Sequence, residues 1–550
     1  MLVHRLSRAT EPGRGQRGEH MERDGDSTTP PTDARPNVAE RSATFIGSFA
    51  LLGRIVERAS AFGLIILIAS VYGSSFHADL YFIASIGPLL IGSTVGEAIG
   101  TALLPALVRA EPDREEEQRV LASAFWLVFA GLVAIAAVYV GGVAIVVHAQ
   151  APAGSARLAP WLAFAPLTVL LGLSGYLAAV LLRFQRYIWP PFRMAIASVG
   201  ALVFTGIALL FSHDIAYVGA AVSAGWAVSV GLMFVEAIHA AGTSAFGRPS
   251  RAAARKVLGL GRKTASAALS SLLGGQVFVL LERLIASTAG VGAVATLSYA
   301  RGIAFAPSIL GQAVAAGIYP GMVRAHERRE PALVQHFLLR SLRLTLFIGA
   351  CVATYFLIYG DPVASAVLQR GQLGAAAAVA VGAVLSAFSL AVVGNMLLIL
   401  ASRTFFAIDY FAAAALAQGA VLVVYVVVAV PFREAWGLSG LALAFGVAEL
   451  SGGITGLVLA VRRLGMSGGV LAREAVLPAL ARGAFIAVLL LIYRLGIHLV
   501  GVPLHLRGLV DMGGSGLVLV VASIVVLWFA GWPETERIKS VAGRMLGRVR

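Results

Sequence analysis

Charged residues are scarce in this 550-residue chain. Asp, Glu, Lys and Arg make up only 13% of it, against about 25% in soluble domains. Hydrophobic residues make up 58%, which is more than a soluble core needs. Many apolar runs reach about 20 residues, the length that an α-helix needs to cross about 30 Å of hydrocarbon. The sequence therefore predicts an all-α, polytopic integral membrane protein.

Cysteine and histidine are also rare, which argues against several kinds of chemistry. Cys351 is the only cysteine, so no disulfide can form within the chain and a cysteine-based metal site is not expected. The 10 histidines are scattered without metal-ligand spacing, and no convincing phosphate-binding P-loop is found. Long loops that could hold a soluble catalytic domain are missing. We therefore expect no enzymatic activity, no cofactor and no metal site.

The apolar runs predict about fourteen transmembrane helices. Six are expected in the first half of the chain, at residues 43–72, 78–107, 121–147, 158–182, 187–211 and 215–240. Six more are expected in the second half, at residues 262–286, 293–323, 338–359, 373–402, 409–430 and 436–461. Two additional helices follow, near residues 475–500 and 513–532.

This pattern divides the chain into lobes, a linker and two tails. Residues 1–42 are polar and are expected to form a disordered cytoplasmic tail. We expect a six-helix lobe at 43–241, a basic cytoplasmic linker at 242–261 and a second six-helix lobe at 262–464. The last parts are the two extra helices, at 465–533, and a basic cytoplasmic tail at 534–550.

Arginine is concentrated in alternate loops. The predicted loops that contain Arg109, Arg183 and Arg248 are rich in arginine, whereas those that contain Arg157 and Arg370 have few basic residues. Cytoplasmic loops of membrane proteins are enriched in Lys and Arg, so both termini are expected in the cytoplasm of a bacterial-type inner membrane. The formal net charge of +15 is thus explained by arginine in the loops that are expected to be cytoplasmic, and no nucleic-acid partner is expected.

Short motifs recur between the two halves. Residues 104–110 (LPALVRA) resemble residues 319–325 (YPGMVRA), and Glu57-Arg58 recurs as Glu282-Arg283. Each repeat would contain six helices, an even number, so both halves would have the same orientation. Such parallel repeats are related by an axis along the membrane normal and form a site between them. Coincidence is the alternative for motifs this short.

Several charged residues fall inside predicted helices, where a charge costs about 2.5–3.5 kcal/mol on insertion scales. Residues of this kind usually face a wet cavity or a partner. The candidates for a substrate-binding cavity are Arg54, Arg58, Asp79, Glu97, Glu282, Arg283 and Arg301. A cluster of guanidinium groups in a medium of low dielectric constant suits a diphosphate, whose oxygens it can bind bidentately.

Structural roles are the alternative for some of these residues. Glu57 and Glu97 are equally explained as partners of neighbouring arginines, and Asp79 as a charge at a helix N-terminus. Arg58 and Arg301 are harder to explain in this way, because no membrane interface lies within reach of either side chain.

Parts of the sequence resemble the MurJ/MviN family of lipid II flippases. The resemblance rests on residues 282–287 (ERLIAS), 297–301 (LSYAR) and 318–320 (IYP), and on Arg370-Gly371. It also includes Arg58, Gly73, Ala78-Asp79, Pro88, Glu97 and Pro105 in the first two predicted helices. It covers about residues 44–464 and then the two C-terminal helices.

The resemblance implies fourteen helices in two lobes around a cationic cavity, with the last two helices forming a lipid-facing groove. Arg58, Asp79, Glu97 and the region of Arg301 would line the site. Three positions depart from the family pattern, at two places in the sequence. Leu64 and Ile65 stand where the family has an Arg-Asp pair, and Gly302 stands where it has an arginine.

The predicted function is that of a flippase that translocates an undecaprenyl-diphosphate-linked sugar, either lipid II or a related glycan, by alternating access. Its partners would be the polyprenyl-diphosphate-linked glycan, membrane lipids and a coupling ion. Two alternatives stay open at this point. One is a cation-coupled exporter of drugs or metabolites from the same superfamily, and the other is a transport-inactive scaffold of a polysaccharide assembly complex.

Overall fold

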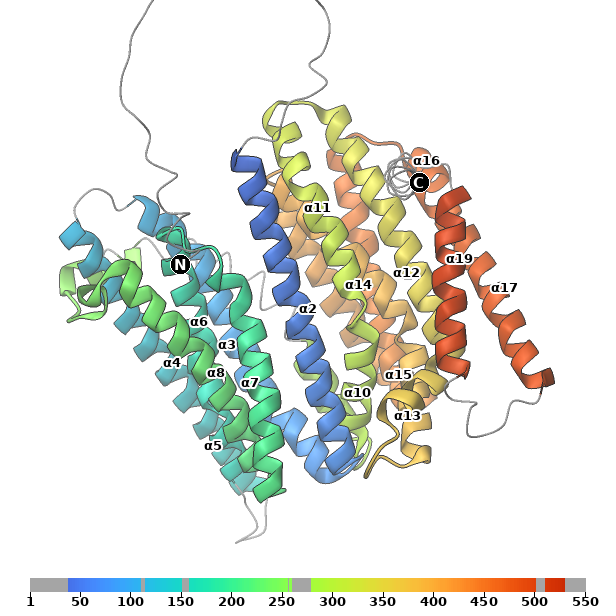
Figure 1. Ribbon diagram of the computed structural model, residues 1–550, viewed down its shortest axis with the longest axis horizontal. Helices are drawn as coiled ribbons and strands as arrows, with labels where there is room; N and C mark the ends of the chain where they lie inside the picture. Colours follow the sequence, from blue (N-terminus) through green and yellow to red (C-terminus); the bar gives the residue numbers. More distant parts are fainter. Residues whose placement is uncertain are drawn as a thin grey trace, which may run out of the picture. The chain divides into compact units, whose positions relative to one another are not determined.

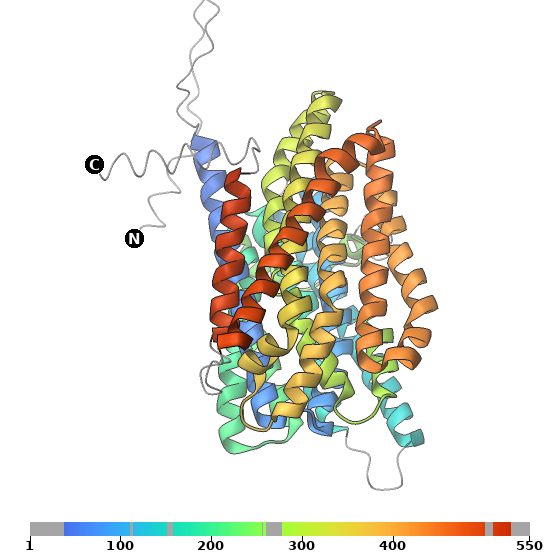
Figure 2. The same cartoon turned by 90° about the vertical axis from the view of Figure 1, so that its right-hand side faces the viewer.

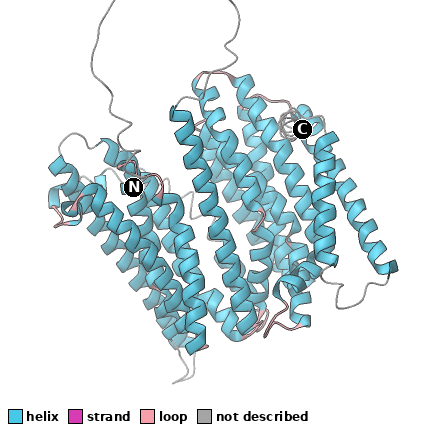
Figure 3. Cartoon of the chain, in the orientation of Figure 1, coloured by secondary structure: helices cyan, strands magenta, loops and turns pink. Residues whose placement is uncertain are grey.

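The protein is almost entirely helical wherever its structure is described (Figure 3). The computed structural model describes residues 38–109, 114–150, 158–255, 257–259, 278–500 and 510–529. Within these ranges, ten helices are long and apolar enough to cross a membrane, or eleven when a bent pair counts as one span. The prediction of an all-α polytopic membrane protein is confirmed, whereas the total of fourteen spans stays a prediction.

The first half of the chain contains seven labelled α-helices (Figure 1). They are α2 (Val38–Tyr72), α3 (Phe76–Arg109), α4 (Arg114–Gln150), α5 (Ala159–Phe164), α6 (Pro166–Arg183), α7 (Trp189–Phe211) and α8 (Ile215–Ala241). Helix α2 begins at Val38 and so includes the last residues of the predicted tail. Small residues let these helices approach closely. A Cβ atom added at Gly175 of α6 would collide with the carbonyl oxygen of Gly96 in α3.

The second half begins with a helical segment at residues 278–287. It continues with α10 (Ala293–Phe305), α11 (Ser308–Glu327), α12 (Pro331–Leu368), α13 (Ala375–Ala387), α14 (Ser389–Ala407) and α15 (Phe411–Arg463). The chain then forms α16 (Gly468–Leu471), η2 (Ala472–Val476), α17 (Leu477–Val500), η3 (Val510–Gly514) and α19 (Ser515–Phe529).

Helix α15 consists of two antiparallel helices rather than one. Its 53 residues are interrupted at Trp436 and Gly437, where the backbone is not helical. The ring centroids of Tyr425 and Phe445 lie 6.2 Å apart, whereas a straight helix would separate residues 20 positions apart by about 30 Å. The chain therefore folds back at Gly437, which agrees with the two predicted helices at 409–430 and 436–461.

Proline divides two of the predicted helices. Pro166 separates α5 from α6, and Pro307 separates α10 from α11, which meet at an angle of 41°. Proline has no N–H to donate, and its ring clashes with the carbonyl group four residues earlier. The predicted helices at 158–182 and 293–323 are thus each built from two pieces.

The two C-terminal helices, α17 and α19, lie beside α12 (Figure 2). The Tyr359 hydroxyl donates to the carbonyl oxygen of Leu490 at 3.1 Å, and the Tyr355 and Ser515 hydroxyls are 3.2 Å apart. Arg343 of α12 also forms an ion pair with Glu474 of η2. Hydrogen bonds from α12 therefore hold both helices of the C-terminal pair.

The predicted linker and tails are only partly described. Residues 243–246 form η1 (Thr243–Phe246), and residues 251–255 are helical. The indole nitrogen of Trp126 in α4 donates to the carbonyl oxygen of Gly247 at 2.8 Å, which fixes this segment. Residues 1–37 and 534–550 lie outside the described residues, and the division into two lobes stays a prediction.

Hydrogen bonds to backbone carbonyl groups join the two halves at the end of α2 and at the turn that follows it. The Gln372 N–H donates to the carbonyl oxygen of Ser70, and the Tyr299 hydroxyl donates to that of Gly73, each at 2.8 Å. Gly292 lies against the same turn with a φ of +83°, and a Cβ atom there would collide with the carbonyl oxygen of Ser74. Glycine is required at this position for both reasons.

We predict that Gly292→Ala destabilises the protein by more than about 1 kcal/mol, the typical cost of a left-handed backbone for a residue with a Cβ atom. The thermal unfolding midpoint of the purified protein measures this change. Gly317→Ala in α11 is the matched control, because no atom of another helix lies within 4 Å of its added Cβ. Equal midpoints for the two variants would contradict the proposed close contact.

Candidate functional site

A cavity of about 620 Å³ lies between segments from both halves of the chain. Helix α2, the segment 278–287, and helices α10, α11, α14 and α15 supply its walls. Its polar and charged lining residues are Arg58, Arg301, Ser308, Gln312, Asn395, Gln418 and Glu449. The remaining walls are apolar, which is typical of ligand sites in which a few polar groups fix the orientation of the ligand.

Arg58 reaches the cavity from α2 and its side chain is exposed. One turn earlier on the same helix, Arg54 forms an ion pair with Glu57 at 3.1 Å. The nearby carboxylate is thus engaged by Arg54. Arg58 therefore gives the α2 wall of the cavity a positive charge.

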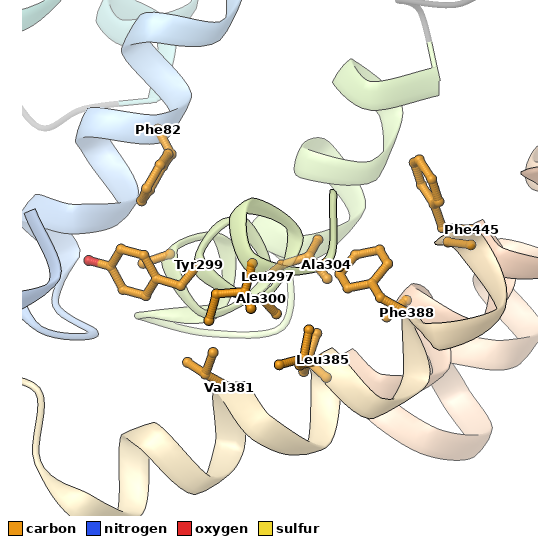
Figure 4. Packing of buried hydrophobic residues seen from close by; sticks show 14 of the residues in the cluster. Phe82, Leu297, Tyr299, Ala300, Ala304, Val381, Leu385, Phe388 and Phe445 are labelled. Atoms are coloured by element: carbon orange, nitrogen blue, oxygen red, sulfur yellow. The ribbon is translucent and has the colours of Figure 1, made fainter. Parts of the chain in front are cut away.

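Arg301 reaches the same cavity from α10. Its guanidinium forms an ion pair with Glu282 and lies 4.1 Å from the centre of the Phe445 ring, with Phe388 and Phe305 at 5.8 and 5.9 Å. Figure 4 shows Phe388 and Phe445 beside α10. Aromatic faces attract a cation electrostatically, so the carboxylate and the three rings hold this arginine in place.

A carboxylate and neutral amides complete the polar lining. Glu449 of α15 is 4% exposed, and one of its carboxylate oxygens lies 3.5 Å from the amide nitrogen of Asn395 in α14. Gln312 and Gln418 add two more amides from α11 and α15. Together these groups can both donate and accept hydrogen bonds, as the hydroxyl groups of a sugar require.

Asp79 was predicted to line the cavity, but it is not among the lining residues. It is 6% exposed, and its two carboxylate oxygens accept hydrogen bonds from the backbone N–H groups of Gly292 and Ala295 at 2.6 and 2.7 Å. These N–H groups belong to the N-terminal end of α10, where a negative charge is favourable. Asp79 therefore connects α3 to α10 and is not among the residues that line the cavity.

Glu282 and Arg283 also differ from their predicted positions, since neither is among the lining residues. Glu282 is buried behind Arg301, and Arg283 donates to the carbonyl oxygen of Phe82 in α3. The Arg283 guanidinium also lies 5.6 Å from the centre of the Phe82 ring. The segment 278–287 thus contacts the cavity arginine through Glu282 and α3 through Arg283.

Arg54 and Glu97 belong to a second charged group, outside the lining of the cavity. Both are near Arg193 of α7, and Glu57 also contributes to the electrostatic environment of that arginine. Here charges from α2, α3 and α7 balance one another. This arrangement corresponds to the structural alternative for Glu57 and Glu97, in which both act as partners of arginines.

The cavity amides were not identified from the sequence. Gln312, Asn395 and Gln418 are neutral, and a search for charges inside apolar helices passes over them. A polar side chain in a membrane-spanning helix nevertheless needs a hydrogen-bonding partner or water. That requirement is the signal by which the three residues could have been found.

The two departures from the family pattern touch each other. Ile65 lines the cavity, and a Cβ atom added at Gly302 would lie 2.5 Å from the Ile65 Cδ1 atom. The space next to Arg301 is thus filled by an apolar side chain from α2. Arg301 itself still lines the cavity, although the resemblance places the arginine one residue later.

Within the described residues, no group of three or more His, Cys, Asp or Glu side chains could hold a metal ion. Spanning helices around a cavity lined by arginine, amide and carboxylate groups are the architecture of a membrane transporter. The model of the family described as "Lipid II flippase MurJ" matches residues 68–504. The chain belongs to this family of membrane transporters.

Solved structures show the same fold. A structure described as "Lipid II flippase MurJ, inward closed conformation" has a TM-score of 0.70 at 16% identity, covering 86% of this chain and 97% of that one. An inward-facing multidrug resistance MATE family transporter of the MOP superfamily has a TM-score of 0.59 at 16% identity, covering 74% and 94%. The Vibrio cholerae MATE transporter VcmN in the bent form has a TM-score of 0.51 at 16% identity, covering 78% and 100%. A search of curated proteins found no match.

We predict that Asp79→Asn lowers the thermal unfolding midpoint. One of the two N–H groups at Gly292 and Ala295 would lose its acceptor, at a cost of about 1–3 kcal/mol for a buried group. Asp214→Asn is the control, because Asp214 is an exposed helix cap that accepts from Ala216 and Asn caps helices equally well. Unchanged stability of Asp79→Asn would contradict the structural role.

Proposed function

We propose that the protein is a flippase that moves an undecaprenyl-diphosphate-linked glycan, either lipid II or a related glycan, across the inner membrane by alternating access. The observation that carries this proposal is that Arg58 and Arg301, from separate halves of the chain, line one cavity. Membership of the family supports transport of this class of substrate.

The chemistry of the cavity suits a diphosphate attached to a sugar. Guanidinium groups bind phosphate oxygens through paired, charge-assisted hydrogen bonds. Gln312, Asn395 and Gln418 can bind sugar hydroxyl groups beside them. The volume of about 620 Å³ falls in the range of about 300–1,000 Å³ that is common for small-molecule sites. In this proposal the polyprenyl chain stays in the lipid phase, along the groove that the family resemblance assigns to the C-terminal helices.

The position of Ile65 at the cavity wall is the reason why both lipid II and a related glycan are candidate substrates. The cavity has an apolar side chain where the family resemblance implies a charged pair. A substrate recognised through fewer ionic contacts fits this wall better. We therefore propose the polyprenyl-linked diphosphate as the recognised element and leave the glycan to be identified by experiment.

The exporter and scaffold alternatives receive less support. The MATE transporters share the fold at 16% identity, and Arg58 and Arg301 repel the cationic compounds that a cation-coupled drug exporter would bind. An inactive scaffold would have no need for two arginines at a cavity wall, where each charge is costly.

We predict that Arg58→Ala and Arg301→Ala each slow flipping by about 10- to 100-fold. A hydrogen bond to a charged group contributes about 1.5–3 kcal/mol, and each variant removes at least one such bond to the diphosphate. The measurement is flipping of a fluorescent undecaprenyl-diphosphate glycan in proteoliposomes. Arg370→Ala is the control, because Arg370 lies in the exposed loop after α12, outside the cavity lining, and donates to Ala366 near the end of α12. Normal flipping by both cavity variants would remove the arginines from the site.

Rescue of cells depleted of lipid II flipping separates the two substrate classes. Rescue by this chain would assign lipid II. A folded, membrane-inserted protein that flips a related glycan in vitro but does not rescue would assign that glycan instead. A protein that flips neither substrate would contradict the proposed function and favour the scaffold.

We also propose that both termini and the basic linker lie in the cytoplasm. Cys351 is the only cysteine and is buried, so Cys351→Ala gives a cysteine-free background. In that background we predict that Arg251→Cys reacts with a membrane-impermeant maleimide only from the cytoplasmic side. Ala289→Cys should react only from the opposite side, since both positions are exposed. Labelling of both from one side would contradict this orientation.

A further inference from the structure

We propose that Glu282 is a built-in counter-ion of Arg301 that an anionic substrate group must displace in order to bind. Glu282 is then a positioning residue that sets the affinity of the cavity and permits release. The inference rests on the proposed function, because it concerns the anion-binding step of the same cavity.

The burial of this pair makes the competition direct. Glu282 has a side-chain exposure of 1% and Arg301 of 18%, so the carboxylate is shielded while part of the arginine stays open to the cavity. A buried carboxylate that loses its partner becomes an uncompensated charge, which costs several kcal/mol. Glu282 therefore holds Arg301 firmly while the cavity is empty.

The atoms of the Arg301 guanidinium differ in their contacts and burial. Nη2 contacts Glu282, and both Nε and Nη2 are buried. The 18% of the Arg301 side chain that is exposed therefore belongs to atoms other than Nε and Nη2. An arriving phosphate oxygen first meets this open part. It can bind bidentately only when the guanidinium turns away from Glu282.

The aromatic rings allow the guanidinium to rotate while they keep it at the cavity. Phe445, at 4.1 Å from the guanidinium carbon, offers its π face, and Phe305 and Phe388 lie within 6 Å. Attraction to a ring face has no fixed hydrogen-bond direction. The rings keep the cation at the cavity while its hydrogen-bonding partner changes from Glu282 to phosphate.

The neighbouring charges show why Glu282 and not Glu449 has this role. Both carboxylates, together with Arg283, contribute to the electrostatic environment around Arg301. Glu449 is hydrogen-bonded to Asn395, whereas Glu282 is the carboxylate in the ion pair with Arg301. Arg283 is itself engaged by the carbonyl oxygen of Phe82. Removal of the Glu282 charge thus acts mainly on Arg301.

Displacement of a counter-ion weakens binding but speeds release. Energy spent on breaking the ion pair is subtracted from the affinity for the diphosphate. It is returned when the substrate leaves and the pair forms again. A transporter benefits from this exchange, because a substrate that binds too tightly traps one state of the cycle.

The test compares Glu282→Gln with the wild-type protein. We expect inorganic pyrophosphate to bind the purified full-length variant at least about fivefold more tightly, a typical size for such coupling. In proteoliposomes the KM for the undecaprenyl-diphosphate glycan should fall while kcat also falls. A purely structural role of Glu282 would lower kcat without tighter binding.

Two further variants keep the test decisive. Glu282→Asp keeps the negative charge but moves it away from Arg301 by one methylene. It should therefore show smaller changes in the same direction in pyrophosphate affinity, KM and kcat, and it tests the proposal even if Glu282→Gln does not fold. Glu115→Gln breaks the exposed Arg119–Glu115 pair of α4, outside the cavity, and should leave pyrophosphate affinity and KM unchanged. Unchanged or weaker pyrophosphate binding by the Glu282 variants would overturn the proposal.

Failure of the proposed function gives a different result. If the wild-type protein does not flip the lipid but Glu282→Gln still binds pyrophosphate more tightly, the counter-ion role stands and the flippase assignment falls. If the wild-type protein flips the lipid and neither Glu282 variant changes affinity or KM, the counter-ion role falls alone.

Discussion

The need to keep arginine charged inside a membrane is the constraint on which this structure depends. A charge at the bilayer centre costs about 2.5–3.5 kcal/mol on insertion scales. Arg301 meets this cost through Glu282 of the segment 278–287 and three phenylalanine rings. The rings belong to Phe305 of α10, to Phe388 between α13 and α14, and to Phe445 of α15. The contacts that compensate the charge of Arg301 thereby fix how these segments pack around the cavity.

Other buried or partly buried charges are compensated by backbone groups and join helices. Asp79 accepts from the N-terminal N–H groups of α10, and Arg283 donates to a carbonyl oxygen of α3. In the C-terminal pair, Arg494 donates to the carbonyl oxygen of Ile358. A charge that is hydrogen-bonded to the backbone of a neighbouring helix in this way has a structural role, whereas Arg58 and Arg301 have part of the side chain open to the cavity.

Much of the fold could be predicted from the sequence, and the reason is local. Apolar runs have the length of a membrane span, so the helices could be located. The breaks at Pro166 and Pro307 were not predicted, although the proline at each of them is the local signal. The partners of charged residues are less predictable, because they depend on contacts between distant segments. Asp79 accepts from residues more than 200 positions away, and no pattern near Asp79 indicates this partner. The cavity amides were missed because they are neutral.

The contact between Ile65 and Gly302 shows how the site can change without losing its cationic character. A side chain at position 302 would compete with Ile65 for the same space, so the apolar residue on α2 and the glycine on α10 depend on each other. The neighbouring Arg301 remains at the cavity through Glu282 and Phe445. The positive charge at the cavity and the shape of the adjoining wall are therefore set by different residues. In the proposed function, the first property serves recognition of the diphosphate and the second serves selection of the glycan.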